Sequence, residues 1–253
     1  MRSAAVDWGG AFRLGGTLSR AAFRVLEGIG SARLDAHDAA PAIARRKRAA
    51  ALRAVLAELC RIHRIDTVLR GRIPEAPAVL VANHSSYLDP MVLAGLVPAA
   101  PIAKREVADW PVIGSGARSL GVLFVDRSDP FSGAAVLREA LRCLEAGVHV
   151  LCFPEGTTTT GETLLPFHRG LFGAARLAGV PIVPIALGYE DPSLCWVGDD
   201  DFLPHYLRTT ARHRTGAHVS IGAPIEARAC STAEALAIEA HWRINDLLAG
   251  SCR

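Results

Sequence analysis

Two stretches of this chain decide its fold: PAVLVANHSSYLDP at residues 77–90 and VHVLCFPEGTTTTGETLLPF at residues 148–167. Each stretch opens with a short apolar run, which is typical of a buried strand, and becomes polar where that run ends. His84 and Asp89 follow the first run, and Glu155 follows the second. Because polar groups beyond the ends of strands commonly build a shared site, the two stretches together point to one functional site.

Strand-like and helix-like segments alternate outward from these two stretches. Strand-like runs occupy residues 77–82, 100–103, 121–126, 148–153, 181–187 and 217–221, and helix-like segments occupy residues 88–97, 110–119, 131–146, 168–178 and 231–249. Gly147 and Gly179 stand at expected helix C-caps, and Ser231 with Glu234 forms the pattern of a capping box. We expect an α/β fold: a single domain with a mixed, mostly parallel sheet flanked by helices, and an irregular excursion at residues 190–216.

The first 70 residues carry no motif and differ in character from the rest. We expect two helices there, at residues 10–34 and 43–65, and the second has apolar residues at helical spacing at positions 52, 55, 56, 59 and 62. Residues 1–70 hold 13 Lys and Arg against 6 Asp and Glu, which suggests an anionic partner. The second helix either lies on an anionic membrane surface or packs on the domain with solvated arginines. We assign residues 1–70 as N-terminal amphipathic helices that associate with a membrane.

The composition limits what else the chain can be. Its 253 residues are half hydrophobic, enough for one large domain, and the net charge is only +3. No uncharged apolar run reaches the ~18 residues of a membrane-spanning helix, and the N-terminus lacks the apolar centre of a signal peptide. The six cysteines show no metal-ligand spacing, so we expect free thiols, a buried Cys152, a reducing compartment and no metal site. The chain lacks a P-loop and a GxGxxG fingerprint, and we expect no cofactor and no nucleic-acid partner.

The two polar blocks differ in specificity. With 9 His and 13 Asp in 253 residues, ~0.5 pairs with the spacing His-x4-Asp are expected by chance, so that spacing alone is weak. His241 and Asp246 share it within a helix-like segment, where residues five apart do not face each other. His84 differs because Asn83 precedes it and a strand-like run leads into it. The string Phe-Pro-Glu-Gly-Thr is much rarer and is the stronger signal.

These blocks resemble the motifs of the glycerolipid acyltransferase family, which includes the 1-acylglycerol-3-phosphate acyltransferases. The four family motifs match, in order, NHxxxxD as Asn83, His84 and Asp89, an apolar stretch ending in Arg as GVLFVDR with Arg127 last, FPEGT as Phe153 to Thr157, and a Pro-containing strand as PIVPIAL at residues 181–187. The resemblance covers about residues 75–190. It implies an acyltransferase domain at residues 71–253, of which residues 75–190 are the motif-bearing core.

One departure from the family pattern concerns the position after FPEGT. Many phosphatidate-forming members have an Arg there that is thought to hold the acceptor phosphate, whereas this chain has Thr158 in a run of four threonines. Family branches that act on lyso-ornithine lipid and on lysophospholipids are similar in having small polar residues there. The resemblance therefore favours such an acceptor, with lysophosphatidic acid as the alternative.

The family reaction gives His84 and Asp89 defined roles. Acyl transfer from a thioester to a hydroxyl needs a base beside the hydroxyl, and an imidazole ionises near neutral pH. We expect His84 to take the proton and Asp89 to fix the imidazole tautomer and stabilise the cation. A turn at SSYL followed by a helix start would return Asp89 to His84. A nucleophilic Ser85 or Ser86 is the alternative, although neither lies in a G-x-S-x-G elbow.

The residues of the FPEGT block are candidates for substrate binding. Glu155 could bind the polar head of the acceptor or order the loop that faces His84, and Gly156 allows a close backbone approach. Thr157 and Thr158 offer hydroxyls and backbone N–H groups to an anionic or zwitterionic head.

Basic residues at the ends of other runs complete the set of candidates. Lys104 and Arg127 each close a strand-like run and are expected to hold a phosphate or headgroup in the same cleft. Asn83 is a further candidate for substrate binding, and His168 with Arg169 could compensate for the missing Arg.

We therefore predict a membrane-associated O-acyltransferase of lipid biosynthesis. It transfers a fatty acyl group from acyl-CoA or acyl carrier protein to the free hydroxyl of a lysolipid, without an acyl-enzyme. The expected partners are the lysolipid, the acyl donor and an anionic membrane surface, on the cytoplasmic face of a bacterial inner membrane. The alternatives are a 1-acylglycerol-3-phosphate acyltransferase, a serine lipid hydrolase and a catalytically idle lipid-binding protein.

Overall fold

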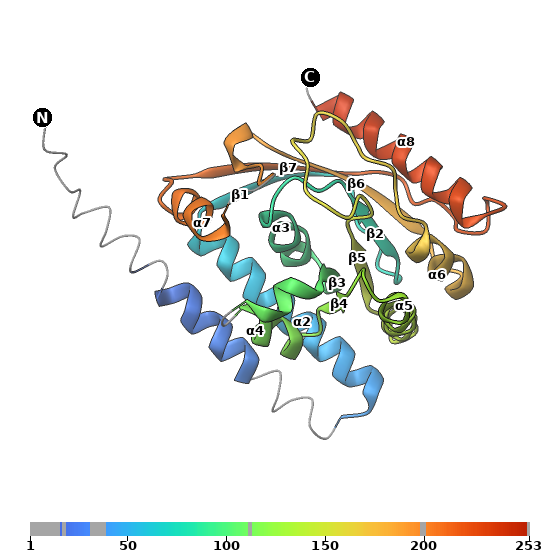
Figure 1. The fold of residues 1–253 in the computed structure, drawn as a ribbon, viewed down its shortest axis with the longest axis horizontal. Coiled ribbons are helices and arrows are strands. Elements are labelled where there is room, and N and C mark those ends of the chain that lie inside the picture. The colour runs from blue at the N-terminus through green and yellow to red at the C-terminus, as the bar shows by residue number, and fades with distance from the viewer. Residues whose placement is uncertain (1–15, 17–18, 31–38, 111–112, 198–200, 252–253) are drawn as a thin grey trace, which may run out of the picture.

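The apolar runs of the sequence form a seven-stranded sheet in the computed structural model, which describes residues 16, 19–30, 39–110, 113–197 and 201–251 (Figure 1). The strands are β1 (Ile65–Arg70), β2 (Val79–Ala82), β3 (Ala99–Lys104), β4 (Leu123–Val125), β5 (His149–Cys152), β6 (Ile182–Tyr189) and β7 (Thr215–Ile221). Their order across the sheet is β1-β7-β6-β2-β5-β3-β4. Neighbouring strands are parallel except for the antiparallel pair β6 and β7, so the expected mixed, mostly parallel sheet is confirmed.

Strand β2 is the central strand that positions the site. Its four residues are at most 1% exposed, because β5 and β6 flank it and helices cover both of its faces. The register pairs Val81 with Cys152 of β5 and Ala82 with Ile185 of β6. The loops that leave β2 and β5 therefore begin side by side at one edge of the sheet.

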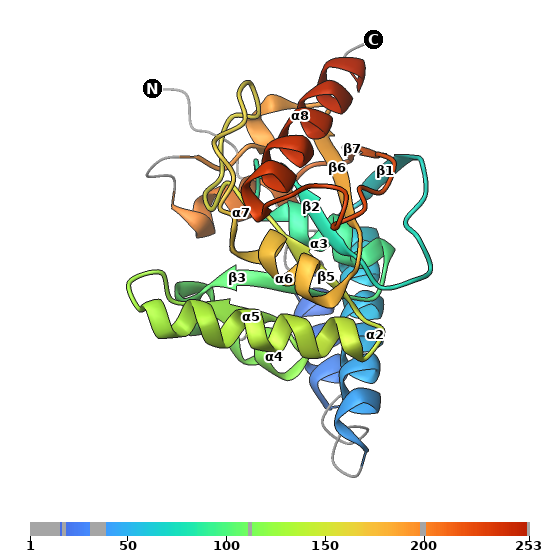
Figure 2. The ribbon, with the colours of Figure 1, turned by 90° about the vertical axis from the view of Figure 1, so that its right-hand side faces the viewer.

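The helices form layers on the two faces of the sheet. They are α2 (Pro41–Ile62), α3 (Leu88–Leu96), α4 (Ile113–Ser119), α5 (Pro130–Glu145), α6 (Gly170–Ala178), α7 (Phe202–Thr210) and α8 (Ala233–Ser251), with short 3₁₀ turns at η1 (Arg105–Asp109) and η2 (Pro192–Leu194). Helices α5, α6 and α8 pack on one face, and α2 and α3 pack on the other (Figures 1 and 2).

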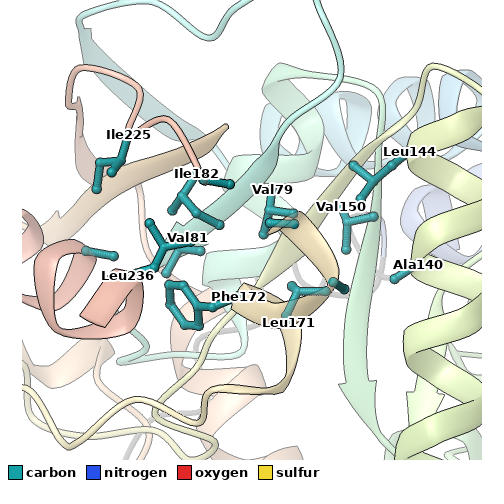
Figure 3. Close-up of a cluster of buried hydrophobic side chains, with 14 of the residues drawn as sticks. Val79, Val81, Ala140, Leu144, Val150, Leu171, Phe172, Ile182, Ile225 and Leu236 are labelled. Carbon is teal, nitrogen blue, oxygen red and sulfur yellow. The ribbon is translucent and has the colours of Figure 1, made fainter. Parts of the chain in front are cut away.

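Alternate residues of β2 point into two separate cores, as the pleat of a strand requires. Val79 and Val81 join the core beneath α5, α6 and α8, where Phe172 is 1% exposed (Figure 3). Leu80 and Ala82 point the opposite way, into the core that α3 covers. Burial on both faces explains why this strand is a continuous apolar run in the sequence.

Helix ends mostly follow the expected capping residues. Gly147 and Gly179 have φ of +80° and +67° directly after α5 and α6, so both predicted C-cap glycines are confirmed. The predicted capping box of α8 is wrong by one residue. Thr232, not Ser231, is the cap, because its Oγ1 accepts a hydrogen bond from Ala235 N at 3.0 Å.

The apolar stripe of α2 faces protein. Leu52 and Val55 are 4% and 8% exposed, and α2 packs against α3 and against the helix at residues 19–30. At Gly28 of that helix a side chain would come within 2.3 Å of Val55, so glycine permits the close approach. Of the two interpretations of α2, the structure supports packing on the domain, because its apolar stripe faces α3, the helix at residues 19–30 and the interior of the protein.

Two elements were not predicted from the sequence. The expected helix at 43–65 ends at Ile62, and residues 65–70 form β1, which pairs with β7. The sheet therefore extends into the last six residues of the region that we assigned to N-terminal helices. The segment at 190–216, which we expected to be irregular, contains α7 and the start of β7. Leu194 of this segment packs into the core that α3 covers. Searched over the described residues, no helix combines the length and hydropathy needed to cross a bilayer.

Part of the expected N-terminal helix at residues 10–34 lies outside the described residues, as does Cys252. Residues 19–30 are helical, which confirms the described part of that prediction. The five described cysteines are free thiols.

Candidate active site

His84 and Asp89 meet where the chain leaves β2 and enters α3. A turn at Tyr87 starts the helix, and Asp89 lies in its first turn, where the helix dipole favours a carboxylate. Asp89 Oδ2 lies 2.8 Å from His84 Nδ1. The turn predicted at SSYL is confirmed, and it brings into contact two side chains that are five residues apart.

The carboxylate of Asp89 is fully buried and has a donor on each oxygen. Oδ2 also accepts hydrogen bonds from Ser85 N at 2.7 Å and Ser86 N at 2.9 Å. Oδ1 accepts a hydrogen bond from the hydroxyl of Tyr189 at 2.7 Å. Because an ionised carboxylate can only accept, His84 donates through Nδ1–H, which leaves Nε2 as a proton acceptor.

The ring of His84 is held at the wall of a cavity. Its side chain is 20% exposed, and it stacks on the ring of Phe153 with centroids 4.3 Å apart. The backbone carbonyl of His84 accepts a hydrogen bond from Thr159 N at 2.9 Å. The first and second blocks of the sequence therefore contact each other directly, as the sequence predicted.

Asn83 contacts the backbone of the neighbouring strand β6 through its side chain. Its side chain is buried, and its amide makes two hydrogen bonds to the backbone of Leu187 in β6, at 2.9 Å and 2.8 Å. Asn83 does not line the cavity that His84 faces. Both ends of its amide join β6 to the start of the His84 loop, so substrate binding by Asn83 stays a prediction without a contact that supports it.

Glu155 lies behind His84, on the side away from the cavity. Its carboxylate is 4% exposed, and it accepts hydrogen bonds from His84 N at 2.8 Å and from Leu165 N at 2.9 Å. Burial raises the pKa of Glu155, and these two backbone hydrogen bonds oppose the rise. Of its two predicted roles, the contacts are those of a residue that orders the loop facing His84. Glu155 does not line the cavity, so no contact supports its binding of the acceptor.

Gly156 makes the close approach that the sequence predicted. Its φ is +78°, and a side chain there would come within 3.0 Å of the guanidinium of Arg127 and 3.1 Å of the ring of His168. Arg127 and His168 both line the cavity next to this glycine. Arg169 instead points outward, with its guanidinium 3.8 Å from Glu234, so only His168 of that pair joins the site.

Lys104 and Arg127 lie at the same edge of the sheet. Lys104 pairs in register with Val125, two residues before Arg127, and both basic side chains line the cavity. Thr157 and Thr158 line the same cavity. The structure therefore brings together near His84 the basic and hydroxyl groups that were predicted to bind a headgroup.

The cavity itself has a volume of about 1200 Å³ and extends well beyond His84. Most of its lining surface is apolar, and α2, α4, α5 and the helix at 19–30 contribute to it, with Leu56, Leu59 and Ile113 among the lining residues. Drug-sized ligands occupy pockets of ~300–1,000 Å³, so this cavity admits something larger and mostly apolar. Within the described residues, no group of three or more His, Cys, Asp and Glu side chains is arranged to hold a metal ion.

An aromatic wall closes the cavity on the side of α7, and the sequence analysis missed it. The wall comprises Tyr87, Trp110, Trp196, Phe202 and Tyr206, all of which line the cavity. Their rings contact one another, with centroids 4.2 Å apart for Trp110 and Phe202 and 5.1 Å apart for Tyr87 and Phe202. Phe202 and Tyr206 stand four residues apart, a helical spacing that could have revealed α7.

Candidate nucleophiles are poorly placed for covalent catalysis. Ser85 and Ser86 are 3% and 0% exposed, and neither lines the cavity. Cys152 does line it, but burial raises the pKa of its thiol to about 12, an effect that Arg127 only partly opposes. A thiol that stays protonated at neutral pH is a weak nucleophile.

Comparison with known families matches this chain to an acyltransferase family model. The model described as Acyltransferase matches residues 61–188, about half of the chain. The match includes β1 to β5 and almost all of β6, and it contains His84, Asp89 and the FPEGT block.

Curated relatives and a solved structure agree with this match. The chain is 36% identical over 201 residues to a lyso-ornithine lipid O-acyltransferase of Pseudomonas aeruginosa, covering 78% of this chain and 77% of the relative. It is 36% identical over 120 residues to a 1-acyl-sn-glycerol-3-phosphate acyltransferase of Neisseria gonorrhoeae, covering 47% of each. The crystal structure of the 1-acyl-sn-glycerophosphate acyltransferase PlsC from Thermotoga maritima has the same fold. Its TM-score is 0.70 at 20% identity, and the alignment covers 96% of this chain and 95% of PlsC.

Proposed function

The chain belongs to the acyltransferase family, and we propose that it transfers a fatty acyl group to the free hydroxyl of a lysolipid. The observation that carries this proposal is the His84–Asp89 pair. Its 2.8 Å contact uses Nδ1 and leaves Nε2 as the acceptor on a ring at the wall of a large apolar cavity. A base at the wall of an apolar cavity suits a reaction between a hydroxyl and a fatty thioester.

The residues support direct transfer in which every proton has a place. His84 Nε2 takes the proton of the acceptor hydroxyl as its oxygen attacks the thioester carbonyl. The carbon–sulfur bond then breaks, and the departing thiolate takes the proton from His84. Asp89 holds the imidazolium between these two events, because its fully buried carboxylate lies on Nδ1.

The fatty chains of the substrates would occupy the apolar part of the cavity. Each methylene removed from water contributes ~0.8 kcal/mol, so a long chain binds strongly without polar contacts. The donor would be acyl-CoA or acyl carrier protein, both of which are anionic and suit the basic residues Lys104 and Arg127 at the cavity wall.

We further propose lyso-ornithine lipid as a better acceptor than lysophosphatidic acid. Thr158 lines the cavity where the phosphatidate-forming branch has an Arg, and the relative from Pseudomonas aeruginosa is named for lyso-ornithine lipid. A zwitterionic head needs less positive charge than a phosphate. The hydroxyls of Thr157 and Thr158 together with Arg127 supply donors for its carboxylate.

We propose that the helix at 19–30 contacts an anionic membrane from which the lysolipid enters. Phe23 and Leu26 on this helix are 64% and 58% exposed, and Arg20 and Arg24 stand beside them. The cytoplasmic face of a bacterial inner membrane remains the predicted location. Flotation with anionic and neutral vesicles tests the contact: replacing Phe23 and Leu26 with Asp should abolish binding, and unchanged binding would contradict it.

Purified protein, radiolabelled acyl-CoA and a panel of lysolipids test the proposed function. We expect transfer to lyso-ornithine lipid, or to a lysophospholipid, that is lost in His84→Ala. The assay is repeated with acyl carrier protein as donor if acyl-CoA gives no product. The absence of transfer with both donors and all acceptors would overturn the proposal.

Thr158→Arg tests the choice of acceptor in the same assay. The variant restores the residue of the phosphatidate-forming branch, so activity on lysophosphatidic acid should rise about tenfold, the worth of a charge-assisted contact. Activity on lyso-ornithine lipid should fall or stay level. A wild type that already prefers lysophosphatidic acid would contradict the acceptor proposal and leave the acyltransferase chemistry standing.

The geometry disfavours a serine hydrolase. Ser85 and Ser86 are buried within the His84 loop, and the backbone N–H groups of both donate hydrogen bonds to Asp89. Labelling by a serine-reactive fluorophosphonate, with fatty acid release in the absence of acceptor, would reverse this conclusion.

A further inference from the structure

Tyr189 is a buried residue of β6 that neither the family motifs nor the family match, which ends at residue 188, assigns to the reaction. We propose that Tyr189 is a positioning residue that fixes Asp89 and sets how strongly Asp89 holds the proton on His84. This inference rests on the proposed function. It also predicts a change in the protonation midpoint of His84, which can be measured without any substrate.

The contacts of Asp89 divide between its two oxygens. Oδ2 accepts from His84 Nδ1, Ser85 N and Ser86 N, all within the same loop. Oδ1 accepts a hydrogen bond from the hydroxyl of Tyr189 at 2.7 Å, and Tyr189 is the donor that comes from a different element of the fold. Tyr189 therefore fixes the rotation of the Asp89 carboxylate about its Cβ–Cγ bond, and with it the direction in which Oδ2 meets the imidazole of His84.

The hydroxyl of Tyr189 keeps its proton throughout the working pH range. Burial raises the pKa of Tyr189 well above its usual value, and the neighbouring Asp89 raises it further, as do Cys60 and Cys195 to a smaller extent. A protonated phenol beside an ionised carboxylate is a permanent donor. It withdraws negative charge from Asp89 that would otherwise act on the imidazolium.

The end of β6 holds the His84 loop at two points. Leu187 exchanges two backbone hydrogen bonds with the amide of Asn83, and Tyr189, two residues later on the same face of the strand, reaches Asp89. The antiparallel register pairs Tyr189 with Ala217 of β7, so its backbone is fixed in the sheet. The hydroxyl is therefore delivered by a rigid strand and not by a mobile loop, as accurate positioning requires.

Other charged groups face His84 as well, and they stay in place when Tyr189 is changed. Glu155 accepts from the backbone N–H of His84, and Lys104, Arg127 and His168 line the same cavity. Within the described residues, none of these four side chains makes a hydrogen bond or ion pair with Tyr189, so a change at position 189 reaches His84 through Asp89.

The test compares the wild type with Tyr189→Phe, which removes only the hydroxyl. The proton on His84 is followed by NMR of the ring nitrogens from about pH 5 to 9, with His84→Gln to assign the signal. Without the hydroxyl, Asp89 retains more charge and holds the imidazolium more tightly. We expect the His84 midpoint to move to higher pH by about half a unit or more. In the acyl-transfer assay we expect kcat to fall about tenfold and KM for the acceptor to stay unchanged. The acid limb of the plot of kcat against pH should move to higher pH, as the His84 midpoint does.

A second variant of nearly the same shape guards against loss of the fold. Replacement of Tyr189 by 3,5-difluorotyrosine gives a more acidic phenol and a stronger donor, so the His84 midpoint should move in the opposite direction, to lower pH. In an Asp89→Asn background, Tyr189→Phe should cause no further loss of kcat, because the group through which it acts is gone.

The outcomes separate the two proposals. Unmoved His84 midpoints in both Tyr189 variants would overturn the positioning role, whatever the enzyme acylates. A lowered free energy of unfolding in Tyr189→Phe with an unmoved midpoint would also overturn it, since that is the result of a structural role alone. A wild type that acylates no lysolipid while its His84 midpoint still responds would overturn the proposed function and leave the Tyr189 inference intact.

Discussion

His84 with Asp89, and His241 with Asp246, have the same spacing in the chain and different surroundings in the structure. The first pair joins the end of β2 to the first turn of α3, and its side chains are 2.8 Å apart. The second pair lies entirely within α8. There the ring of His241 packs edge-on against Phe167 with centroids 4.9 Å apart, and Asp246 is exposed.

This difference shows that the backbone between the two residues, and not their spacing, brings a histidine and an aspartate into contact. Five residues of regular helix place two side chains on different faces, whereas a strand end, a turn and a helix start place them face to face. Burial then adds what the spacing cannot. Asp89 is fully buried among four donors, so its carboxylate is held in one orientation.

The largest expected effect contrasts the two histidines. His84→Ala should lower kcat by about 10³–10⁴-fold, the upper range for loss of a general base, and should leave the fold intact. His241→Ala should change kcat less than about twofold, because it alters a packing contact away from the cavity. Steady-state kinetics of both variants, with circular dichroism to confirm folding, checks this contrast. Full activity of His84→Ala would remove the basis of the mechanism.

The two aspartates provide the next contrast. Asp89→Asn should lower kcat by about 10²–10³-fold, because the amide can present an N–H to His84 Nδ1 and so favour the tautomer that cannot accept at Nε2. Asp246→Asn changes an exposed side chain and should have no measurable effect on kcat. Equal effects of the two substitutions would show that the 2.8 Å contact has no role in turnover.

Stability should also distinguish the aspartates. Asp89→Ala leaves the N–H groups of Ser85 and Ser86 without their acceptor in a buried loop, so the free energy of unfolding should fall by roughly 2–4 kcal/mol. Asp246→Ala should stay within about 0.5 kcal/mol of the wild type. Urea unfolding of the three proteins measures both differences. A stability loss in Asp246→Ala as large as that in Asp89→Ala would contradict the proposed importance of the buried contacts.

The smallest expected effect concerns Glu155, which supports the His84 loop from behind. Because burial raises the pKa of Glu155 above its ordinary value of 4.5, the folded state holds the proton more tightly than the unfolded state. The contribution of Glu155 to the free energy of unfolding is therefore full below about pH 4.5 and is lost as the pH rises through the raised value. Urea unfolding at several pH values should show a flatter profile for Glu155→Gln than for the wild type. Parallel profiles would contradict the burial effect.

Much of the sheet could be predicted because β2, β5 and β6 are buried on both faces and therefore appear as continuous apolar runs. Strand β1 could not be predicted, since five of its six residues are half-buried or exposed and the segment directly follows the helical pattern of α2. Helix α7 was missed because the acidic residues before it and Pro204 within it predict a loop. Its position depends on contacts of Tyr206 and His205 with distant residues.

The sequence identified His84, Asp89 and Gly156 because each belongs to a short motif, NHxxxxD or FPEGT, in which its residue type has a defined chemical or conformational property. It could not place the amide of Asn83, because an amide beside a histidine gives no sign of whether it faces a cavity or the backbone. Glu155 shows the same limit, since only the positions of His84 N and Leu165 N reveal that its two oxygens face backbone.

By itself the sequence determined the α/β class, the acyltransferase family and the pairing of His84 with Asp89, because these depend on local apolar runs and on short motifs that rarely occur by chance. The tertiary structure alone decided which groups support them. Tyr189 lies 100 residues from Asp89, and Asn83 lies 104 residues from Leu187. Contacts over such separations depend on strand order and register, which no local pattern of residues encodes.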